Sequence, residues 1–324
     1  MIFKRHILTV ISRVCHCEAK LRQSLFWVII IALFLFFPSP LFAETKDSIL
    51  SLSKEIISEG TYNMGDGETP SVAESRALLH AKRTALEQAG TYIESYTKVE
   101  NLQLTKDEIQ VLASGIMEVE ILDKKRTVVG DGILFWVKIK AKVNPDKIEE
   151  MAKRVKEKSV IDDYKKIQEA YDKSQKEIEE LKKQLAGAKG EKEKKQVEAK
   201  ITDDERLFEA SQWFEKGYQY ILNNEYDSAI EAFTKAIALD PNYTFAYLNR
   251  GGAVYVSKGQ YDMAIEDYNK AIALDPNDAA AYNNRGVAYG LSGNMGRAIS
   301  DFQKACDMGN EKGCKGLQMV LEKR

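Results

Sequence analysis

Hydrophobic residues alternate with lysine near the middle of the chain, and this period of two predicts a β-strand with one buried face. The buried positions are Val137, Ile139, Ala141 and Val143, and the solvated ones are Lys138, Lys140 and Lys142. A second β-rich run at residues 116–129 precedes this strand across Gly130-Asp131-Gly132. An Asp-Gly pair between two such runs is typical of a β-hairpin. The lysine row is expected to be solvated, with an anionic surface as its alternative contact.

A long helical pattern lies between an earlier predicted strand, residues 55–64, and this hairpin. Ser71 followed by Glu74 predicts an N-cap with a capping box. Alanines then recur at every fourth position, at Ala73, Ala77, Ala81, Ala85 and Ala89. Such a smooth stripe lets a helix lie close against a sheet, although helix propensity alone would also explain it. With a short helix at residues 105–115, the sequence predicts one small α+β domain over residues 44–145.

A heptad pattern occupies the next segment, residues 146–202, which is dense in Lys, Glu and Gln. Tyr164, Tyr171, Ile178 and Leu185 recur every seven residues, and Ile167, Ser174, Leu181 and Ala188 follow each by three. This spacing predicts a coiled-coil helix that Gly187 and Gly190 interrupt. Two hypotheses stay open for this linker: homodimerisation through residues 160–188, or a charged helical spacer that holds the two ends apart.

Beyond residue 203 the chain repeats itself. Residues 226–242 (YDSAIEAFTKAIALDPN) return at 261–277 (YDMAIEDYNKAIALDPN) and, in weaker form, at 295–310. The offsets of 35 and 34 residues and the terminal prolines resemble the tetratricopeptide repeat. The resemblance implies an all-α solenoid of three helical pairs over residues 203–312, followed by a capping helix at 313–324. The second copy has one extra residue at Gly251-Gly252, which we expect to distort its first helix.

The same resemblance implies a concave groove lined by the first helix of each pair. Its predicted partner-binding residues are Phe214, Tyr218, Leu248, Asn249, Asn283 and Asn284. The repeated triplet Asn-Arg-Gly is a candidate clamp for a peptide backbone, because asparagine both donates and accepts hydrogen bonds. Helix packing is the alternative explanation of the triplet. The lysine and arginine set of repeats that clamp a carboxylate tail is not visible, which argues against a chaperone tail as the partner.

Cys306 and Cys314 lie eight residues apart at the end of the repeats. This spacing resembles Sel1-like repeats, in which such a pair bridges the two helices of a hairpin, and the resemblance implies a disulfide. Export to an oxidising compartment would favour the bond. Closing so short a loop would contribute roughly 2–3 kcal/mol. Zinc is not expected, because it needs more ligands than this pair supplies.

The first forty-three residues differ in composition from the rest of the chain. A basic stretch precedes thirteen uncharged apolar residues, Leu25–Phe37, and then comes PSPLFA, ending at Ala43. This pattern predicts a cleaved signal peptide over residues 1–43 and a periplasmic protein of a Gram-negative envelope. An uncleaved inner-membrane anchor is the alternative, and contact with a membrane is expected only in that case.

Composition and histidine content argue against an enzyme. The chain is 44% hydrophobic and 30% charged with a net charge of −2, so no strong bias towards nucleic acid is present. After residue 43 the only histidine is His80, in a charged helical pattern. Histidine-dependent catalysis needs a base poised near neutrality. We therefore expect a non-enzymatic protein without cofactor or metal. A site on Asp66, Glu68 and Glu74 is the remote alternative.

The first domain resembles the N-terminal domain of the flagellar assembly protein FlgT and a similar domain of small outer-membrane lipoproteins. The resemblance rests on Glu59-Gly60, on the alanine-rich helix at 73–90, and on the hairpin that ends in Val-Asn-Pro at 143–145. It implies an envelope protein with an accessory role in flagellar or outer-membrane assembly. FlgT continues into further domains of its own, which this chain replaces with the linker and the repeats.

Overall fold

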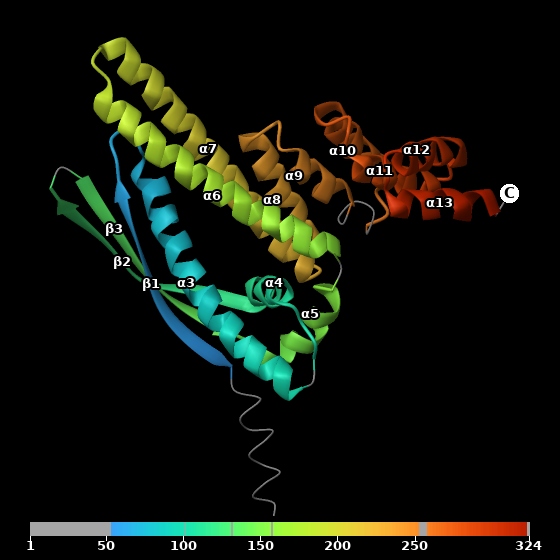
Figure 1. The fold of residues 1–324 in the computed structure, drawn as a ribbon, viewed down its shortest axis with the longest axis horizontal. Helices are drawn as coiled ribbons and strands as arrows, with labels where there is room; N and C mark the ends of the chain where they lie inside the picture. The colour runs from blue at the N-terminus through green and yellow to red at the C-terminus, as the bar shows by residue number, and fades with distance from the viewer. Residues whose placement is uncertain (1–52, 101, 131, 157, 253–257, 323–324) are drawn as a thin grey trace, which may run out of the picture. The chain divides into compact units, whose positions relative to one another are not determined.

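The computed structural model describes residues 53–100, 102–130, 132–156, 158–252 and 258–322 (Figure 1). The predicted signal peptide lies outside these residues. The elements are β1 Lys54–Met64, α3 Pro70–Val99, α4 Lys106–Ile116, β2 Met117–Val129, β3 Gly132–Val143, a 3-10 turn at Pro145–Lys147, α5 Ile148–Arg154, α6 Lys158–Gly187, α7 Glu191–Leu222, α8 Tyr226–Leu239, α9 Thr244–Asn249, α10 Tyr261–Leu274, α11 Ala279–Leu291, α12 Met295–Asp307 and α13 Glu311–Glu322. The mixed fold class, an α+β region followed by a helical array, is confirmed. Within the described chain, no helix has both the length and the apolarity to span a bilayer.

The three strands form an antiparallel sheet in the order β1-β3-β2. The predicted hairpin is confirmed as β2 and β3, and the predicted inner residues of β3 are buried. Two lysines of the opposite face contact carboxylates of the flanking strands. Lys138 lies 3.2 Å from Glu59, and Lys140 lies 3.2 Å from Glu120. Two of the three lysines therefore pair with strand carboxylates of the same sheet.

Helix α3 lies on β1 and β3 through its alanine stripe, and all five alanines are fully buried. Gly60 of β1 faces this stripe, and Ser58 donates a hydrogen bond to the carbonyl of Ala81 at 2.8 Å. The predicted N-cap at Ser71 is wrong, because the helix begins earlier, with Thr69 as N-cap and Pro70 in its first turn. Proline suits that position, since its fixed φ is helical and it lacks the N–H that would be unpaired there. The capping box belongs to α4.

Helix α6 folds back on α7 at the glycines that were predicted to interrupt it. The heptad seam is buried, as predicted, but its partner is the same chain. Ile178, Leu181 and Leu185 form one apolar cluster with Val197 and Ile201 of α7. The seam proposed for homodimerisation through 160–188 is thus taken up within the chain. The spacer hypothesis also needs correction, because α6 contacts the first domain, and the predicted boundary at 202–203 lies inside α7.

A buried polar cluster joins the first domain to the α6–α7 hairpin. Arg76 of α3 donates to Asp204 of α7 at 2.7 Å and to Ser174 of α6 at 3.0 Å. Lys182 of α6 lies 2.8 Å from the fully buried carboxylate of Glu68. Burial raises the pKa of Asp204 to about 6, although Arg76 opposes the shift. Since loss of one partner would leave a buried charge uncompensated, the cluster fixes how the hairpin lies on the domain.

Three consecutive helix pairs, α7–α8, α9–α10 and α11–α12, form the predicted array, and α13 packs on α12. The ring of Phe302 lies between two glycines, because a Cβ at Gly286 or Gly316 would meet it at 3.0 or 2.8 Å. Residues 250–252 adopt a π-helical turn, and a π turn accommodates one extra residue. The expected distortion at Gly251-Gly252 is therefore confirmed.

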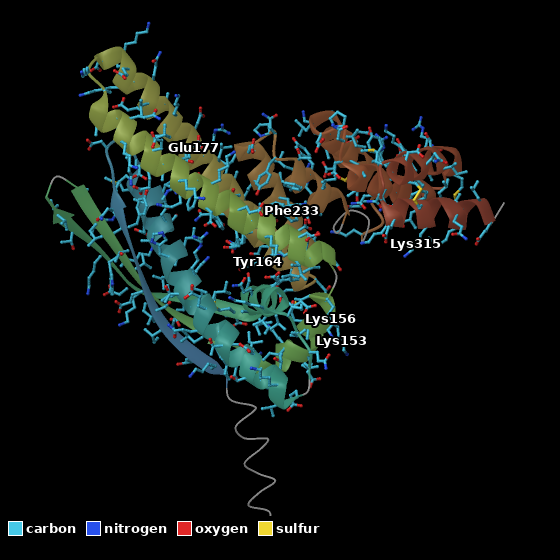
Figure 2. The ribbon with its side chains drawn as sticks, in the orientation of Figure 1. Lys153, Lys156, Tyr164, Glu177, Phe233 and Lys315 are labelled. Atoms are coloured by element: carbon cyan, nitrogen blue, oxygen red, sulfur yellow. A yellow bond between two sulfur atoms is a disulfide. The ribbon has the colours of Figure 1, made fainter. Side chains whose placement is uncertain are left out.

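Side-chain burial agrees with this layering of helices. Tyr164 of α6 and Phe233 of α8, both labelled in Figure 2, are 4% and 0% exposed. Lys153, Lys156 and Glu177, also labelled there, are exposed. The aromatic positions of the heptad and of the repeats thus supply the interior between the helices.

Candidate functional site

A groove of about 630 Å³ opens on the first helices of the second and third repeats. Three elements outside these helices complete its wall: α6, the turn before α11, and the start of α13. Its principal lining residues are Asp162, Asp163, Lys166, Phe245, Leu248, Asn249, Asp278, Asn283, Asn284, Glu311 and Lys312. The groove is therefore built from segments more than a hundred residues apart in sequence.

Four of the six residues predicted to bind a partner line this groove: Leu248, Asn249, Asn283 and Asn284. The other two, Phe214 and Tyr218, do not, which corrects the predicted site. Phe214 is 1% exposed, and its ring packs on Phe233 and Tyr243 at centroid distances of 5.4 and 4.9 Å.

Tyr218 is 4% exposed, and its hydroxyl donates to the carbonyl of Val160 in α6 at 2.6 Å. The N-terminal half of α6 thus covers the inner face of the first repeat. The heptad pattern of α6 showed that an apolar seam had to be buried. It did not show that the first repeat was its partner.

The side-chain amides of Asn249 and Asn284 present complementary groups to the groove. Asn249 uses its Nδ2 to donate to the carbonyl of Phe245 at 3.0 Å, so its Oδ1 stays available as an acceptor. Asn284 accepts a hydrogen bond from Asn283 on its Oδ1 at 3.1 Å, so its Nδ2 stays available as a donor. One acceptor and one donor, contributed by successive repeats, can pair with the N–H and C=O groups of an extended peptide.

The arginine of each Asn-Arg-Gly triplet holds the repeats together. Arg285 forms a bidentate ion pair with Asp301 of α12, with distances of 2.7 and 2.8 Å, and donates to Asn269 of the preceding repeat at 2.7 Å. Arg250 does the same with Asp267, at 2.8 and 2.6 Å. Burial raises the pKa of Asp267 in spite of this partner. The two explanations of the triplet therefore divide by residue: the arginine packs, and the asparagine faces the groove.

Carboxylates outnumber lysines along the groove. Asp162, Asp163, Asp278 and Glu311 line it together with Lys166 and Lys312. Asp278 also caps α11, accepting from the backbone N–H of Ala280 at 2.8 Å. Burial raises the pKa of Asp163, and the neighbouring charges of Asp162 and Asp278 add to this shift, while Lys166 at 3.6 Å opposes it. The end of the groove next to α6 is thus negative.

Two groups considered for catalysis, Glu68 and His80, contact other residues of the fold. Glu68, one of the three carboxylates of the remote alternative, pairs with Lys182 of α6 at 2.8 Å. Glu68 is fully buried, so a substrate does not reach it. His80 lies with Nδ1 2.7 Å from the carbonyl of Thr61. Among the described residues, no cluster of three histidine, cysteine or acidic side chains could hold a metal ion.

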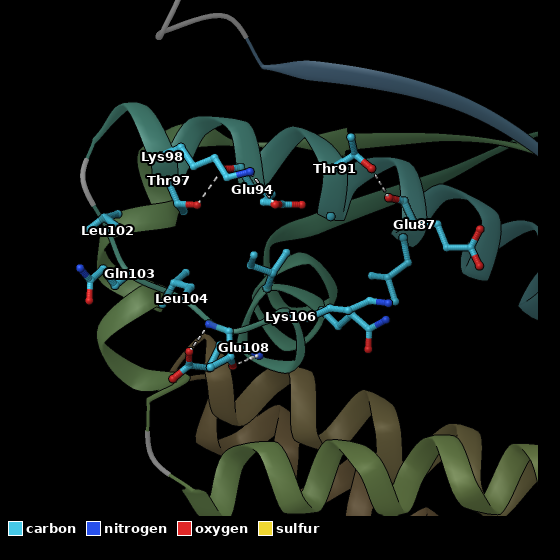
Figure 3. Close-up of a pocket in the computed structure, with 15 residues that line it drawn as sticks. Glu87, Thr91, Glu94, Thr97, Lys98, Leu102, Gln103, Leu104, Lys106 and Glu108 are labelled. Carbon is cyan, nitrogen blue, oxygen red and sulfur yellow. Dashed lines mark hydrogen bonds and ion pairs between the residues drawn. The ribbon is translucent and has the colours of Figure 1, made fainter.

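A larger cavity of about 1070 Å³ lies between α3 and α4 in the first domain (Figure 3). Two of its carboxylates are engaged by their own helices. Glu94 lies 2.7 Å from Lys98, and Glu108 accepts from the backbone N–H of Thr105 at 2.6 Å in the α4 capping box. These contacts stabilise the surface of α3 and the start of α4.

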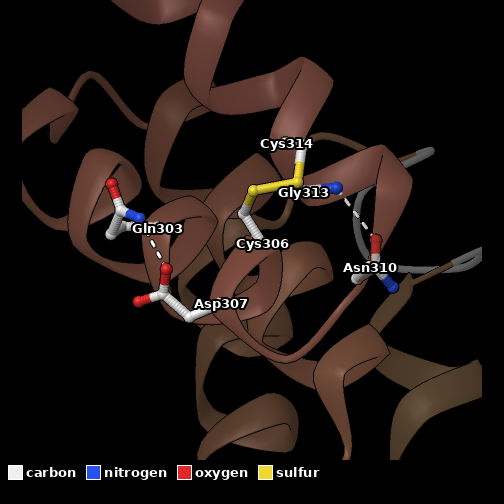
Figure 4. Close-up of a disulfide and its surroundings, with 6 residues drawn as sticks. All are labelled: Gln303, Cys306, Asp307, Asn310, Gly313 and Cys314. Carbon is white, nitrogen blue, oxygen red and sulfur yellow. Dashed lines mark hydrogen bonds between the residues drawn. A yellow bond between two sulfur atoms is a disulfide. The ribbon is translucent and has the colours of Figure 1, made fainter.

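Cys306 of α12 and Cys314 of α13 are joined as a disulfide in the structure (Figure 4). The Cα atoms are 4.6 Å apart. Asn310 caps the final helix by accepting from the backbone N–H of Gly313 at 2.8 Å. The pair therefore fastens α13, whose first turn lines the groove, to the third repeat.

Comparison with known families identifies the repeats. Models described as tetratricopeptide repeat match residues 210–243 and 279–308, and one described as TPR repeat matches residues 252–293. No curated protein matches the chain.

Similar solved structures include the first TPR of Spaghetti (RPAP3) bound to HSP90 peptide SRMEEVD. It is 27% identical, with 35% of this chain and 91% of that chain covered and a TM-score of 0.34. The Sgt2 TPR domain from Aspergillus fumigatus is 25% identical, covering 36% of this chain and 78% of that one, with a TM-score of 0.34. None of the family matches falls on the first domain, so its resemblance to FlgT stays a prediction. The family matches and the helix pairs together show that residues 210–308 of this chain carry tetratricopeptide repeats.

Proposed function

We propose that the chain is a non-enzymatic scaffold whose groove binds an extended segment of a partner protein. The observation that carries this proposal is the pair formed by Asn249 and Asn284. One leaves an acceptor and the other a donor on the groove wall, on successive repeats. Backbone N–H and C=O groups of an extended segment require such partners when they leave water. Leu248 and Phe245 add apolar surface beside them.

The groove is short, because α6 already covers the first repeat. Only the second and third repeats and the start of α13 remain for a partner, so the bound segment is short as well. An acidic tail does not suit this site, since Asp162, Asp163 and Asp278 already make one end negative. The partner segment is therefore neutral or basic.

The test compares two double variants of the full-length chain in affinity capture from envelope extracts. Asn249→Ala with Asn284→Ala removes the groove amides. Asn242→Ala with Asn277→Ala removes two exposed asparagines of the inter-helix turns and serves as the matched control. We expect the control to recover the wild-type set of proteins and the groove variant to lose specific members of it. Equal recovery by both variants would show that the groove amides do not bind a partner.

We also propose that the protein acts in the bacterial periplasm. Support comes from the basic stretch, the apolar run and Ala43 in the first forty-three residues. The intact mass of the protein isolated from its native cells tests this. A chain that begins at Glu44 is the expected result, and a mass that includes residues 1–43 means an inner-membrane anchor instead. An accessory role in flagellar or outer-membrane assembly is a narrower proposal, supported only by the resemblance of residues 44–145.

A further inference from the structure

We infer that the segment held in the groove carries a lysine or arginine side chain, which binds between α6 and the start of α11. This inference rests on the proposed function, because it names the chemistry of the partner in the same groove. Its basis is the charge balance of the groove wall together with the side chains that the groove places around that end.

The end of the groove next to α6 has three carboxylates and one lysine. Asp162 and Asp163 lie in α6, and Asp278 is the N-cap residue of α11. All three line the same groove, and burial, with smaller contributions from the charges of Asp162 and Asp278, raises the pKa of Asp163. Like charges brought together at a partly desolvated site raise the free energy of the unbound protein. A cation between them would relieve this repulsion and gain attraction from more than one carboxylate.

Lys166 does not complete this neutralisation. Its ammonium lies 3.6 Å from Asp163 and 4.0 Å from the ring centroid of Phe245, so the wall of the groove already holds it. Lys165, whose charge also acts on Asp162, is paired with Asp107 at 2.7 Å. Glu311 and Lys312, at the start of α13, balance each other in charge. The unbalanced negative charge of the lining therefore comes from Asp162, Asp163 and Asp278.

The arrangement makes a helix outside the repeats part of the recognition surface. The repeats supply the amides of Asn249 and Asn284, which suit any extended backbone. Helix α6 supplies two of the three carboxylates that select a basic side chain. Charge complementarity of this kind contributes to specificity and steers association. A partner with an acidic residue at the same position would meet repulsion instead.

Selection from a random peptide library displayed on phage, with the full-length chain immobilised, tests the inference without a known partner. Selected peptides are first measured against Asn249→Ala with Asn284→Ala, which reports whether they occupy the groove. We expect groove-dependent peptides to share a lysine or arginine at one fixed position. Groove-dependent peptides without such a position would overturn the inference and leave the proposed function standing. A failure to select any groove-dependent peptide would overturn both.

A charge-removal cycle then locates the basic residue. Asp162→Asn with Asp163→Asn should weaken the selected peptide by at least about tenfold, the low end for close charge pairs at interfaces. It should have little effect on the same peptide with norleucine in place of its basic residue. Glu191→Gln with Glu193→Gln removes two exposed carboxylates of α7 outside the groove and is the control for net charge. Equal losses with the control pair, or with the norleucine peptide, would show that the α6 carboxylates do not receive the side chain.

Discussion

Replacement of Gly60 by alanine probes how closely α3 lies on the sheet. An ideal Cβ at this position would lie 2.2 Å from the carbonyl oxygen of Ala77 and 2.3 Å from the backbone nitrogen of Ala81. A carbon and an oxygen in weak contact need about 3.3 Å. Both contacting atoms belong to the helix backbone and not to a flexible side chain. The substitution therefore requires α3 to move away from β1 by about 1 Å at this point.

The expected loss in the free energy of unfolding follows from the contacts that this movement disturbs. Overpacking of a well-packed interior costs typically about 1–3 kcal/mol, and a clash with backbone belongs at the upper end of that range. The same displacement stretches the 2.8 Å hydrogen bond from Ser58 to Ala81, which adds about 1 kcal/mol. Alanine recovers about 0.5–1 kcal/mol, because it reduces the entropy of the unfolded chain. We expect a net loss of about 3 kcal/mol in the free energy of unfolding of the first domain.

Urea denaturation measures this loss, with far-UV circular dichroism and tryptophan fluorescence as the two probes. Trp136 pairs with Thr61 in the sheet, so its emission follows this domain. Gly296→Ala in α12 is the matched control, since no atom lies within 4 Å of the added carbon. It should be neutral or stabilising by up to about 1 kcal/mol. If the free energy of unfolding of Gly60→Ala lies within about 0.5 kcal/mol of that of the wild type, α3 does not lie as close to β1 as described.

Three further predictions concern the repeats and the domain junction. Arg285→Ala should lower the free energy of unfolding by about 3 kcal/mol, because the carboxylate of Asp301, 8% exposed, loses its bidentate partner. In urea titrations, removing both side chains should recover part of this loss, and an undiminished loss would contradict the pairing. Asp204 has a folded-state pKa raised to about 6, so the folded protein binds a proton that the unfolded chain does not bind between about pH 4 and 6, and its contribution to stability falls as pH rises through 6. Asp204→Asn should reduce the slope of melting temperature against pH between about pH 4 and 6. An unchanged slope would show that other groups cause this pH dependence. Cys306→Ser with Cys314→Ser should destabilise α13 by about 2–3 kcal/mol. Amide hydrogen exchange in α13 should then be faster than in the wild type, while exchange in α8 changes less. Equal exchange of α13 in variant and wild type would show that the disulfide does not stabilise this helix.

Local patterns in the sequence predicted those features that local interactions determine. The hairpin followed from alternation and an Asp-Gly turn, and the alanine stripe followed from a spacing of four. The distortion at Gly251-Gly252, which the structure shows as a π turn at residues 250–252, followed from one extra residue against the repeat next to it. In each case a short stretch contains both the signal and its physical cause, so no knowledge of distant contacts was needed.

The errors arose where a pattern specifies burial without naming the partner. The heptads of α6 required an apolar seam to be buried. Three partners would satisfy that requirement: a second copy of the chain, α7, or the first repeat. Only the fold selects the last two. The cover that α6 forms on the first repeat removes Tyr218 from the groove, and Phe214 is buried against Phe233 and Tyr243. The cap of α3 failed for a local reason, because two N-terminal signals competed. Pro70 moved the start of the helix ahead of Ser71.

The ends of the array explain why this groove differs from what the repeats alone would form. Three stacked pairs are the minimum for a stable array, and each terminal pair leaves an apolar face that needs a cover. Helix α6 covers the first repeat from the inside, and α13 covers the last, fastened at Cys306 and Cys314. Both covering helices also reach the groove, and they contribute all of its charged side chains except Asp278. Under the proposed function, stability of the array and choice of partner therefore depend on the same two helices. Neither of them lies within the residues that match the repeat family.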